Sequence, residues 1–219
     1  MKLRYILLCL LWLLPCTMWR EEGGISQRPT ASLVSEADAC RSLYHDMGLE
    51  GVGNWKAFRQ AVTGYQRIEG RKRDVLTLID FSLPSTAERF FVFDMARHRL
   101  LFSSVVAHGK NSGENYATSF SNEYGSYKSS LGFYLTGSTY QGSNGYSLLL
   151  DGLEKGINDR ARERAIVVHG AAYADPSVAS RGGRLGRSFG CPALPQKLSR
   201  PIIDAIKDGS VMYIYAPTP

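Results

Sequence analysis

The chain has 219 residues, of which 44% are apolar and 21% charged, and its formal net charge is +6. This composition is typical of a globular protein with one well-buried domain and a short appendage, and it argues against a low-complexity or disordered chain. Three of the basic residues, Lys2, Arg4 and Arg20, lie in the first 20 positions. The excess of positive charge in the rest of the chain is small. It is compatible with attraction to an anionic cell envelope and does not require a nucleic-acid partner.

Residues 1–20 predict a secretory signal peptide or an N-terminal anchor. Lys2 and Arg4 precede an uncharged apolar run from Tyr5 to Cys16, which is the order found in signal sequences. The run is shorter than the roughly 20 residues of a membrane-spanning helix, but no Ala-x-Ala cleavage site follows it, so an uncleaved anchor stays open. We expect export across the inner membrane to the periplasm or cell envelope, with membrane contact only if the leader is uncleaved.

A linker and two short helices are expected next. Residues 21–34 mix Gly, Ser, Pro and charged residues without periodicity, as linkers do, and one folded domain is predicted over residues 35–219. Ser35 is a candidate cap for a helix that ends before Gly48. Asn54 is a good cap for a second helix, whose apolar face carries Trp55, Phe58, Val62 and Tyr65.

The rest of the domain has short β-branched and aromatic runs separated by Gly, Ser and Asn. Seven such runs predict strands beginning at Val75, Arg89, Leu100, Leu131, Tyr146, Ala165 and Val211. Two helices are expected among them, one capped by Asn158 and one over Ser199 to Asp208, before Gly209. Because strands and helices do not alternate regularly, a parallel α/β sheet is disfavoured and a mainly β fold is predicted.

Two cysteines remain if the leader is removed, Cys40 and Cys191. In an oxidising compartment they could form a disulfide; otherwise Cys191 could be a packed free thiol or a nucleophile. Nucleophilic catalysis needs a thiolate, and therefore a base that accepts the thiol proton. On the residues alone, all three interpretations stay open.

Histidine is the usual base, and the chain has four. His45 and His98 are expected on an exposed helix face and in a charged turn, whereas His108 and His169 each end a predicted strand and precede a glycine. His169 is the better candidate, because the end of the strand AIVVHG can present an imidazole to a cleft. The segment from His169 to Cys191 is rich in Gly, Ser and Arg and can loop back to the histidine.

The residues before Cys191 add further candidates for site chemistry. Gly190 lets the backbone approach a substrate closely, so the amides at 190 and 191 could form an oxyanion hole. Arg181, Arg184 and Arg187 could lower the thiol pKa, pair with a substrate carboxylate, or form a solvated loop. The histidines and cysteines show no metal-ligand spacing, and we expect neither a metal nor a cofactor.

The segment VVHGAAYADPSVASRGGRLGRSFGCPALP resembles the active-site segment of the L,D-transpeptidases of the YkuD type. Their motif is a His-Gly pair, a loop, and then Ser/Thr-His-Gly-Cys, and the branch described as murein L,D-transpeptidase catalytic domain proteins is the most similar. The resemblance extends over residues 35–217 and implies a mainly β, YkuD-like β-sandwich with a few peripheral helices, two of them N-terminal. It also implies roles in the site for Cys191 as nucleophile, His169 as base, and their neighbours Gly170, Ser188 and Gly190.

Two positions depart from the family motif. Phe189 stands where the family has a histidine, and Ala193 stands where it has a polar residue or an arginine; both positions border the substrate in the family. Either recognition of the substrate carboxylate shifts to Arg187 or Arg184, or the two departures mark a different donor or acceptor from the usual tetrapeptide stem. His108 is either a second site histidine that replaces the one lost at position 189, or a residue that merely ends a strand.

The resemblance implies a cysteine-dependent peptidoglycan L,D-transpeptidase, which forms a thioester with the stem peptide and transfers the acyl group to an amine. If water replaces the amine, the enzyme is an L,D-carboxypeptidase or endopeptidase. A third hypothesis is a catalytically inactive peptidoglycan-binding protein on the same fold. In each case the expected partner is a peptidoglycan stem peptide and not a nucleic acid.

Overall fold

The computed structural model describes residues 30–217, and side chains from residue 37 onward. The predicted leader and residues 21–29 of the predicted linker lie outside the described residues. In the part that is described, no helix combines the length and apolar character needed to cross a bilayer.

In the described part of the chain, eight strands form one sheet with the order β3-β2-β1-β8-β4-β5-β6-β7. The pairs β1/β8 and β6/β7 are parallel, and the other neighbours are antiparallel. The strand bounds are β1 Val75–Asp80, β2 Phe90–Asp94, β3 Arg99–Ser104, β4 Gly132–Gly142, β5 Gly145–Gly152, β6 Val167–Ala171, β7 Ala193–Pro195 and β8 Val211–Tyr215. The predicted mainly β fold is confirmed, and the short strand β7 is the one that the sequence pattern missed.

The sheet nearly closes on itself. After β3 the chain pairs with the segment around β7, through isolated bridges between Ala107 and Ala193 and between Gly109 and Ser188. The two edge strands are therefore connected by the segment that follows one of them, which covers polar backbone groups that an open edge would expose. This closure brings residues 107–110 beside the residues that precede Cys191.

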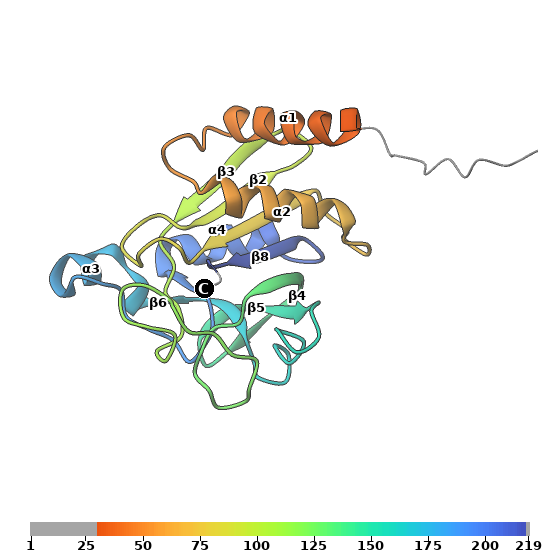
Figure 1. The fold of residues 1–219 in the computed structure, drawn as a ribbon. Helices are drawn as coiled ribbons and strands as arrows, with labels where there is room; N and C mark the ends of the chain where they lie inside the picture. The colour runs from red at the N-terminus through yellow and green to blue at the C-terminus, as the bar shows by residue number, and fades with distance from the viewer. Residues whose placement is uncertain (1–29, 218–219) are drawn as a thin grey trace, which may run out of the picture.

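Within residues 30–217, four α-helices surround the sheet, and two of them are N-terminal, as predicted: α1 Thr30–Asp46, α2 Trp55–Arg67, α3 Pro176–Gly182 and α4 Gln196–Ile206. Figure 1 shows α1 and α2 together at the top of the view and α3 at its left-hand edge, beside β6. The α1 helix starts five residues before the predicted cap, Ser35. In contrast, α2 is capped as predicted, because the Asn54 side chain accepts hydrogen bonds from the Lys56 and Ala57 amides.

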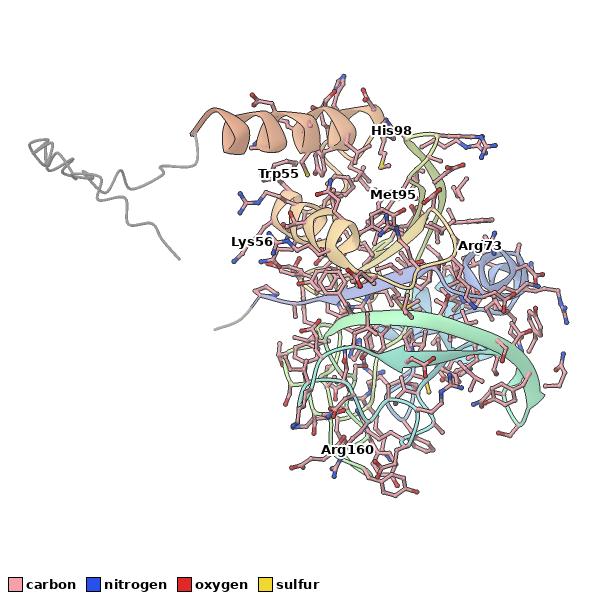
Figure 2. The ribbon with its side chains drawn as sticks, turned by 90° about the vertical axis from the view of Figure 1, so that its right-hand side faces the viewer. Trp55, Lys56, Arg73, Met95, His98 and Arg160 are labelled. Carbon is pink, nitrogen blue, oxygen red and sulfur yellow. The ribbon has the colours of Figure 1, made fainter. Side chains whose placement is uncertain are left out.

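Both faces of the central strands are buried. In β1, Val75 and Ile79 pack into one cluster and Leu76 and Leu78 into the other, as the period of two in a strand requires. One cluster lies under α1 and α2, where Figure 2 shows Trp55 on the side of α2 that faces α1. The cluster on the opposite face includes side chains of α4 and also Cys191. Burial on two faces explains why these strands read as continuous apolar runs.

Two further helix predictions need correction, and one helix was missed. The segment after Asn158 forms turns rather than a helix. There the buried Asn158 side chain accepts from the Glu154 amide and donates to the Leu131 and Phe133 carbonyls, so it joins the turns to β4 instead of capping a helix. The α4 helix begins at Gln196, three residues before the predicted start. The α3 helix, capped by Asp175, was not predicted.

The two described cysteines, Cys40 and Cys191, are both free and buried. Cys40 packs in the cluster under α1 and α2, and Cys191 packs in the cluster on the opposite face of the sheet. A disulfide needs Cα atoms about 4.4–6.8 Å apart, which this separation by the sheet does not provide. The disulfide interpretation is therefore wrong for this fold. Cys191 is either a packed free thiol or a nucleophile.

Candidate active site

Parallel pairing of β6 and β7 brings the predicted base next to the predicted nucleophile. His169 is opposite Ala193 in the register, and Cys191 is two residues before Ala193. Both side chains line one small cavity of about 190 Å³, together with Asn144, Tyr173, Arg187, Ser188 and Phe189. His169 is the third residue of β6 rather than its end, because pairing with β7 extends β6 to Ala171.

The hydrogen bonds of His169 define its tautomer. Its Nδ1 atom lies 3.1 Å from the carbonyl oxygen of Gly170, and since a carbonyl can only accept, the proton is on Nδ1. The Nε2 atom is then an unprotonated acceptor. Burial lowers the pKa of His169, although the Gly170 carbonyl opposes the shift. The imidazole is therefore neutral at neutral pH and able to take a proton.

Cys191 rests as a protonated thiol. Only 9% of the residue is exposed, and burial raises the pKa of its thiol, against the opposing effects of the Val167 amide and of the positive charge on Arg164. The Sγ atom donates a weak hydrogen bond to the carbonyl of Ala165, at 3.6 Å. A buried neutral thiol is a poor nucleophile, so reaction at Cys191 depends on a neighbouring base.

A tight turn before Cys191 is held by Ser188. The Ser188 hydroxyl donates to the Cys191 carbonyl at 2.7 Å and accepts from the Gly190 amide at 3.0 Å. Gly190 has φ of 128°, and a Cβ there would lie 2.9 Å from the Lys128 carbonyl oxygen. Glycine is required at this position by its conformation and by the neighbouring backbone.

The expected oxyanion donors are thus only partly available. The Gly190 amide is already bonded to Ser188, so it does not point freely at a substrate. Among residues 30–217, by contrast, no backbone carbonyl accepts from the Cys191 amide, and this amide lies close enough to the Cys191 sulfur to lower the pKa of the thiol. One donor of the predicted pair, that of Cys191, is left for an oxyanion, and Pro192 has no N–H to add.

Arg187 and Arg184, the expected carboxylate receptors, are paired with a carboxylate of this chain. Glu114 forms ion pairs with Arg187 at 2.6 Å and with Arg184 at 2.9 Å. Arg187 also donates to the carbonyls of Lys110 and Gly113. Arg187 borders the cavity, but its guanidinium holds the 110–114 segment in place. Arg181 lies further away in α3, where it bonds to Ser177.

His108 does not line the cavity. It is 1% exposed, and its Nδ1 atom accepts from the guanidinium of Arg89 at 2.8 Å, because arginine can only donate. Its Nε2–H then donates to the Gly113 carbonyl at 3.2 Å. Burial, with the charge of Arg89, lowers the pKa of His108 to about 4. His108 is a buried neutral link and does not replace the family histidine in this cavity.

The two positions that depart from the motif differ in exposure. Phe189 is 65% exposed and lies at the rim of the cavity, whereas Ala193 is fully buried in β7. Position 189 therefore borders the cavity that contains Cys191, whereas position 193 is buried in the sheet. Gly170 is also a packing residue, because a Cβ there would lie 2.4 Å from the Ser199 hydroxyl of α4.

Three neighbours of the cavity were not found from the sequence. Asn144 comes from the β4–β5 hairpin, and Tyr173 comes from the turn after β6, where burial raises its pKa to about 12. Arg164 donates to the carbonyls of Ser121 and Lys128 and so holds the long 108–130 segment beside Cys191. Nothing in the run NDRARER distinguishes Arg164 from its neighbouring arginines, since its role depends on contacts with residues more than 30 positions away.

Among the described residues, no group of three or more His, Cys, Asp or Glu side chains is arranged to hold a metal ion. The chemistry that this cavity can support on its own side chains is proton transfer from a thiol to a neutral imidazole, with one free backbone amide near the sulfur.

Comparison with known proteins gives a clear family match. A family model described as L,D-transpeptidase catalytic domain matches residues 50–215, more than half of the chain. The matched range contains His169, Cys191 and all the other residues that line the cavity. No curated protein gives a match.

Three solved structures that match are an L,D-transpeptidase from Mycobacterium smegmatis, L,D-transpeptidase 3 from Mycobacterium tuberculosis, and an L,D-transpeptidase from Stackebrandtia nassauensis. The first is 15% identical with a TM-score of 0.41, and the match covers 65% of this chain and 59% of the chain in that structure. The second is 15% identical, with a TM-score of 0.39 and coverage of 65% and 61%. The third is 13% identical, with a TM-score of 0.39 and coverage of 84% and 79%. This chain thus spans less than two thirds of the length of the two mycobacterial structures.

Proposed function

The chain belongs to the L,D-transpeptidase catalytic domain family, and from this premise we propose that it is a cysteine acyltransferase acting on peptidoglycan stem peptides. The observation that carries the proposal is the shared cavity of His169 and Cys191, in which the imidazole is neutral and its Nε2 atom is free to accept a proton. A packed structural thiol would need no such partner. The mature enzyme is proposed to work in the cell envelope, as the leader at residues 1–20 indicates.

The first half of the reaction makes the acyl-enzyme. His169 Nε2 takes the thiol proton, and the Cys191 sulfur attacks the carbonyl carbon that joins the third stem residue to the terminal D-residue. The Cys191 amide stabilises the oxyanion of the tetrahedral intermediate. When that intermediate collapses, the C–N bond breaks, His169 returns the proton to the departing amine, and a thioester remains on Cys191.

The second half transfers the acyl group. An amine from a neighbouring stem attacks the thioester carbonyl, loses a proton to His169, and forms a new peptide bond as the carbon–sulfur bond breaks. The thiolate is then reprotonated. If water attacks instead, the product is a shortened stem with a free carboxylate, and the enzyme is an L,D-carboxypeptidase or endopeptidase.

Incubation of the purified protein with tetrapeptide muropeptides, followed by mass spectrometry, tests this function. The proposal expects cross-linked dimers and a transient adduct on Cys191, both absent from Cys191→Ala and present in Cys40→Ala, the matched thiol control. If trimmed stems are the only products, the enzyme is a hydrolase rather than a transpeptidase. If the muropeptides bind but neither product nor adduct forms, the inactive peptidoglycan-binding hypothesis is favoured.

A further inference from the structure

The donor stem ends in a carboxylate, and the two arginines expected from the sequence to receive it, Arg187 and Arg184, are poorly placed to do so. Glu114 occupies both Arg187 and Arg184, and Arg187 is further bonded to two backbone carbonyls. A substrate carboxylate would have to displace Glu114 and its charge from this cluster. Another cation at the cavity rim is the better receptor, provided that it has no acidic partner of its own.

Lys110 meets this condition. Its ammonium forms no ion pair with a carboxylate among residues 37–217. The Lys110 backbone is fixed beside the site, because its amide donates to the Ser188 carbonyl at 2.8 Å and Gly109 bridges to Ser188. An ammonium that has no carboxylate partner, on a side chain whose backbone is held in place, is suited to binding a ligand anion.

Two exposed aromatic rings hold the Lys110 ammonium at the rim. The Nζ atom lies 4.2 Å from the ring centre of Tyr127 and 4.6 Å from that of Phe189, and the two ring centres are 4.8 Å apart. Phe189 itself lines the cavity that contains Cys191. Contact with ring faces orients an ammonium without neutralising it, so its positive charge stays available.

The backbone of Tyr127 adds to this arrangement. Tyr127 has φ of 54°, a left-handed conformation that is unusual for a residue with a side chain. Its carbonyl accepts from the Asn111 amide, which ties this strained residue to the segment carrying Lys110. Backbone strain of this kind is concentrated at functional sites. The strained turn keeps an exposed aromatic side chain, 41% accessible, next to Lys110.

We propose that Lys110, held over Tyr127 and Phe189, binds the terminal carboxylate of the donor stem peptide and so determines the specificity for a free C-terminus. Phe189 provides an apolar surface for the side chain of the terminal residue. In this arrangement Phe189, which replaces a family histidine, forms part of the carboxylate-binding site together with Lys110 and Tyr127. The inference rests on the proposed function, because it assigns the substrate end that the same cavity recognises.

The kinetic test compares two donors, a stem tetrapeptide with a free C-terminal carboxylate and the same peptide with a C-terminal amide. With the free acid, Lys110→Met is expected to raise KM about tenfold with little change in kcat, because a charge-assisted contact to the bound ground state is lost. With the amide donor the variant should match the wild type. Lys110→Arg keeps a cation at this position and should keep most of the preference for the acid. Lys155→Met, at an exposed position in the 154–165 turns, is the control for the loss of one positive charge and should behave as the wild type.

A binding measurement separates this inference from the proposed function. In a Cys191→Ala background, calorimetry with the same two peptides is expected to show about tenfold tighter binding of the acid, and this preference should disappear when Lys110→Met is added. Failure of the proposed function would remove turnover but leave this preference intact. An unchanged preference in the Lys110→Met protein, or no binding of either peptide, would overturn the role of Lys110.

Discussion

At the scale of single residues, the candidate site combines a proposed base, His169, in its neutral form with a proposed nucleophile, Cys191, in its protonated form. His169 is neutral and has a free Nε2 atom, whereas burial keeps Cys191 protonated. The thiol therefore reacts only as fast as a partner removes its proton. The proposed role of His169 therefore predicts that the reactivity of Cys191 depends on His169, and this can be measured without a substrate.

The first prediction concerns thiol reactivity. His169→Ala should slow alkylation of Cys191 by iodoacetamide at pH 7 by about tenfold or more, because a positioned general base contributes about 10²- to 10⁴-fold in catalysis. Mass spectrometry of the alkylated peptides measures both thiols in one sample. Cys40 is the internal control and should keep its rate. Equal rates at Cys191 in the variant and the wild type would show that His169 does not activate it.

The second prediction concerns Gly190. Gly190→Ala should lower the free energy of unfolding by about 2–4 kcal/mol, because the new Cβ meets the Lys128 carbonyl and φ of 128° is unfavourable for alanine. Gly156→Ala is the matched control: its φ is also positive, at 78°, but nothing lies within 4 Å of the new Cβ, so about 1 kcal/mol is expected. Urea unfolding measures both. Similar losses would mean that contact with Lys128 has little effect.

At the scale of elements, the site depends on irregular segments that are held by side chains rather than by helices. Asn158 is fully buried and joins the 154–165 turns to β4. Arg164, at the end of the same turns, holds the 108–130 segment next to Gly190. These turns therefore connect β4 with the backbone that surrounds Cys191, although they contain no regular secondary structure.

The third prediction follows from that connection. Asn158→Ala should destabilise the protein by about 2–3 kcal/mol, because two backbone carbonyls and one amide lose a buried partner. Asn122→Ala, which removes exposed hydrogen bonds to Asp159 and Arg160 in the same turns, should cost well under 1 kcal/mol. Thermal unfolding measures the two variants. A small effect of Asn158→Ala would contradict a structural role for its side chain.

At the scale of the whole molecule, buried neutral histidines couple folding to pH. His108 has a pKa of about 4 in the folded protein and an ordinary value of 6.5, so the unfolded chain binds the extra proton first. The stability due to neutral His108 is present above pH 6.5 and is lost as the pH falls toward 4. The pKa of His169 is also lowered, which gives a contribution of the same sign.

The fourth prediction is the size of this loss. Between pH 6.5 and pH 4, His108 should remove about 3 kcal/mol of stability, because each pKa unit corresponds to about 1.4 kcal/mol. His108→Asn retains an acceptor for Arg89 but cannot be protonated, so its stability should vary less with pH over this window. Urea titrations at several pH values measure the slopes. Parallel slopes for the two proteins would exclude His108 as the main titrating group.

The sequence by itself determined the mainly β fold, seven of the eight strands, the Asn54 cap and the family. These features depend on local patterns, such as runs of β-branched residues and a capping side chain, or on a motif read along the chain. The short strand β7 was missed because three residues, Ala193–Pro195, carry too little periodicity to be recognised. The pairing of His169 with Cys191 could be suggested from the motif, but its geometry depends on β7.

Only the tertiary structure decided how the charged and polar candidates are used. Arg184, Arg187 and His108 belong to the same loops in sequence as the site, yet their partners are Glu114, Gly113 and Arg89, and the closure of the sheet sets these distances. Charge pairing and burial are properties of neighbours in space, which residue spacing does not encode. The sequence therefore indicates which charged and polar side chains the chain carries, and the fold decides which of them pair with one another.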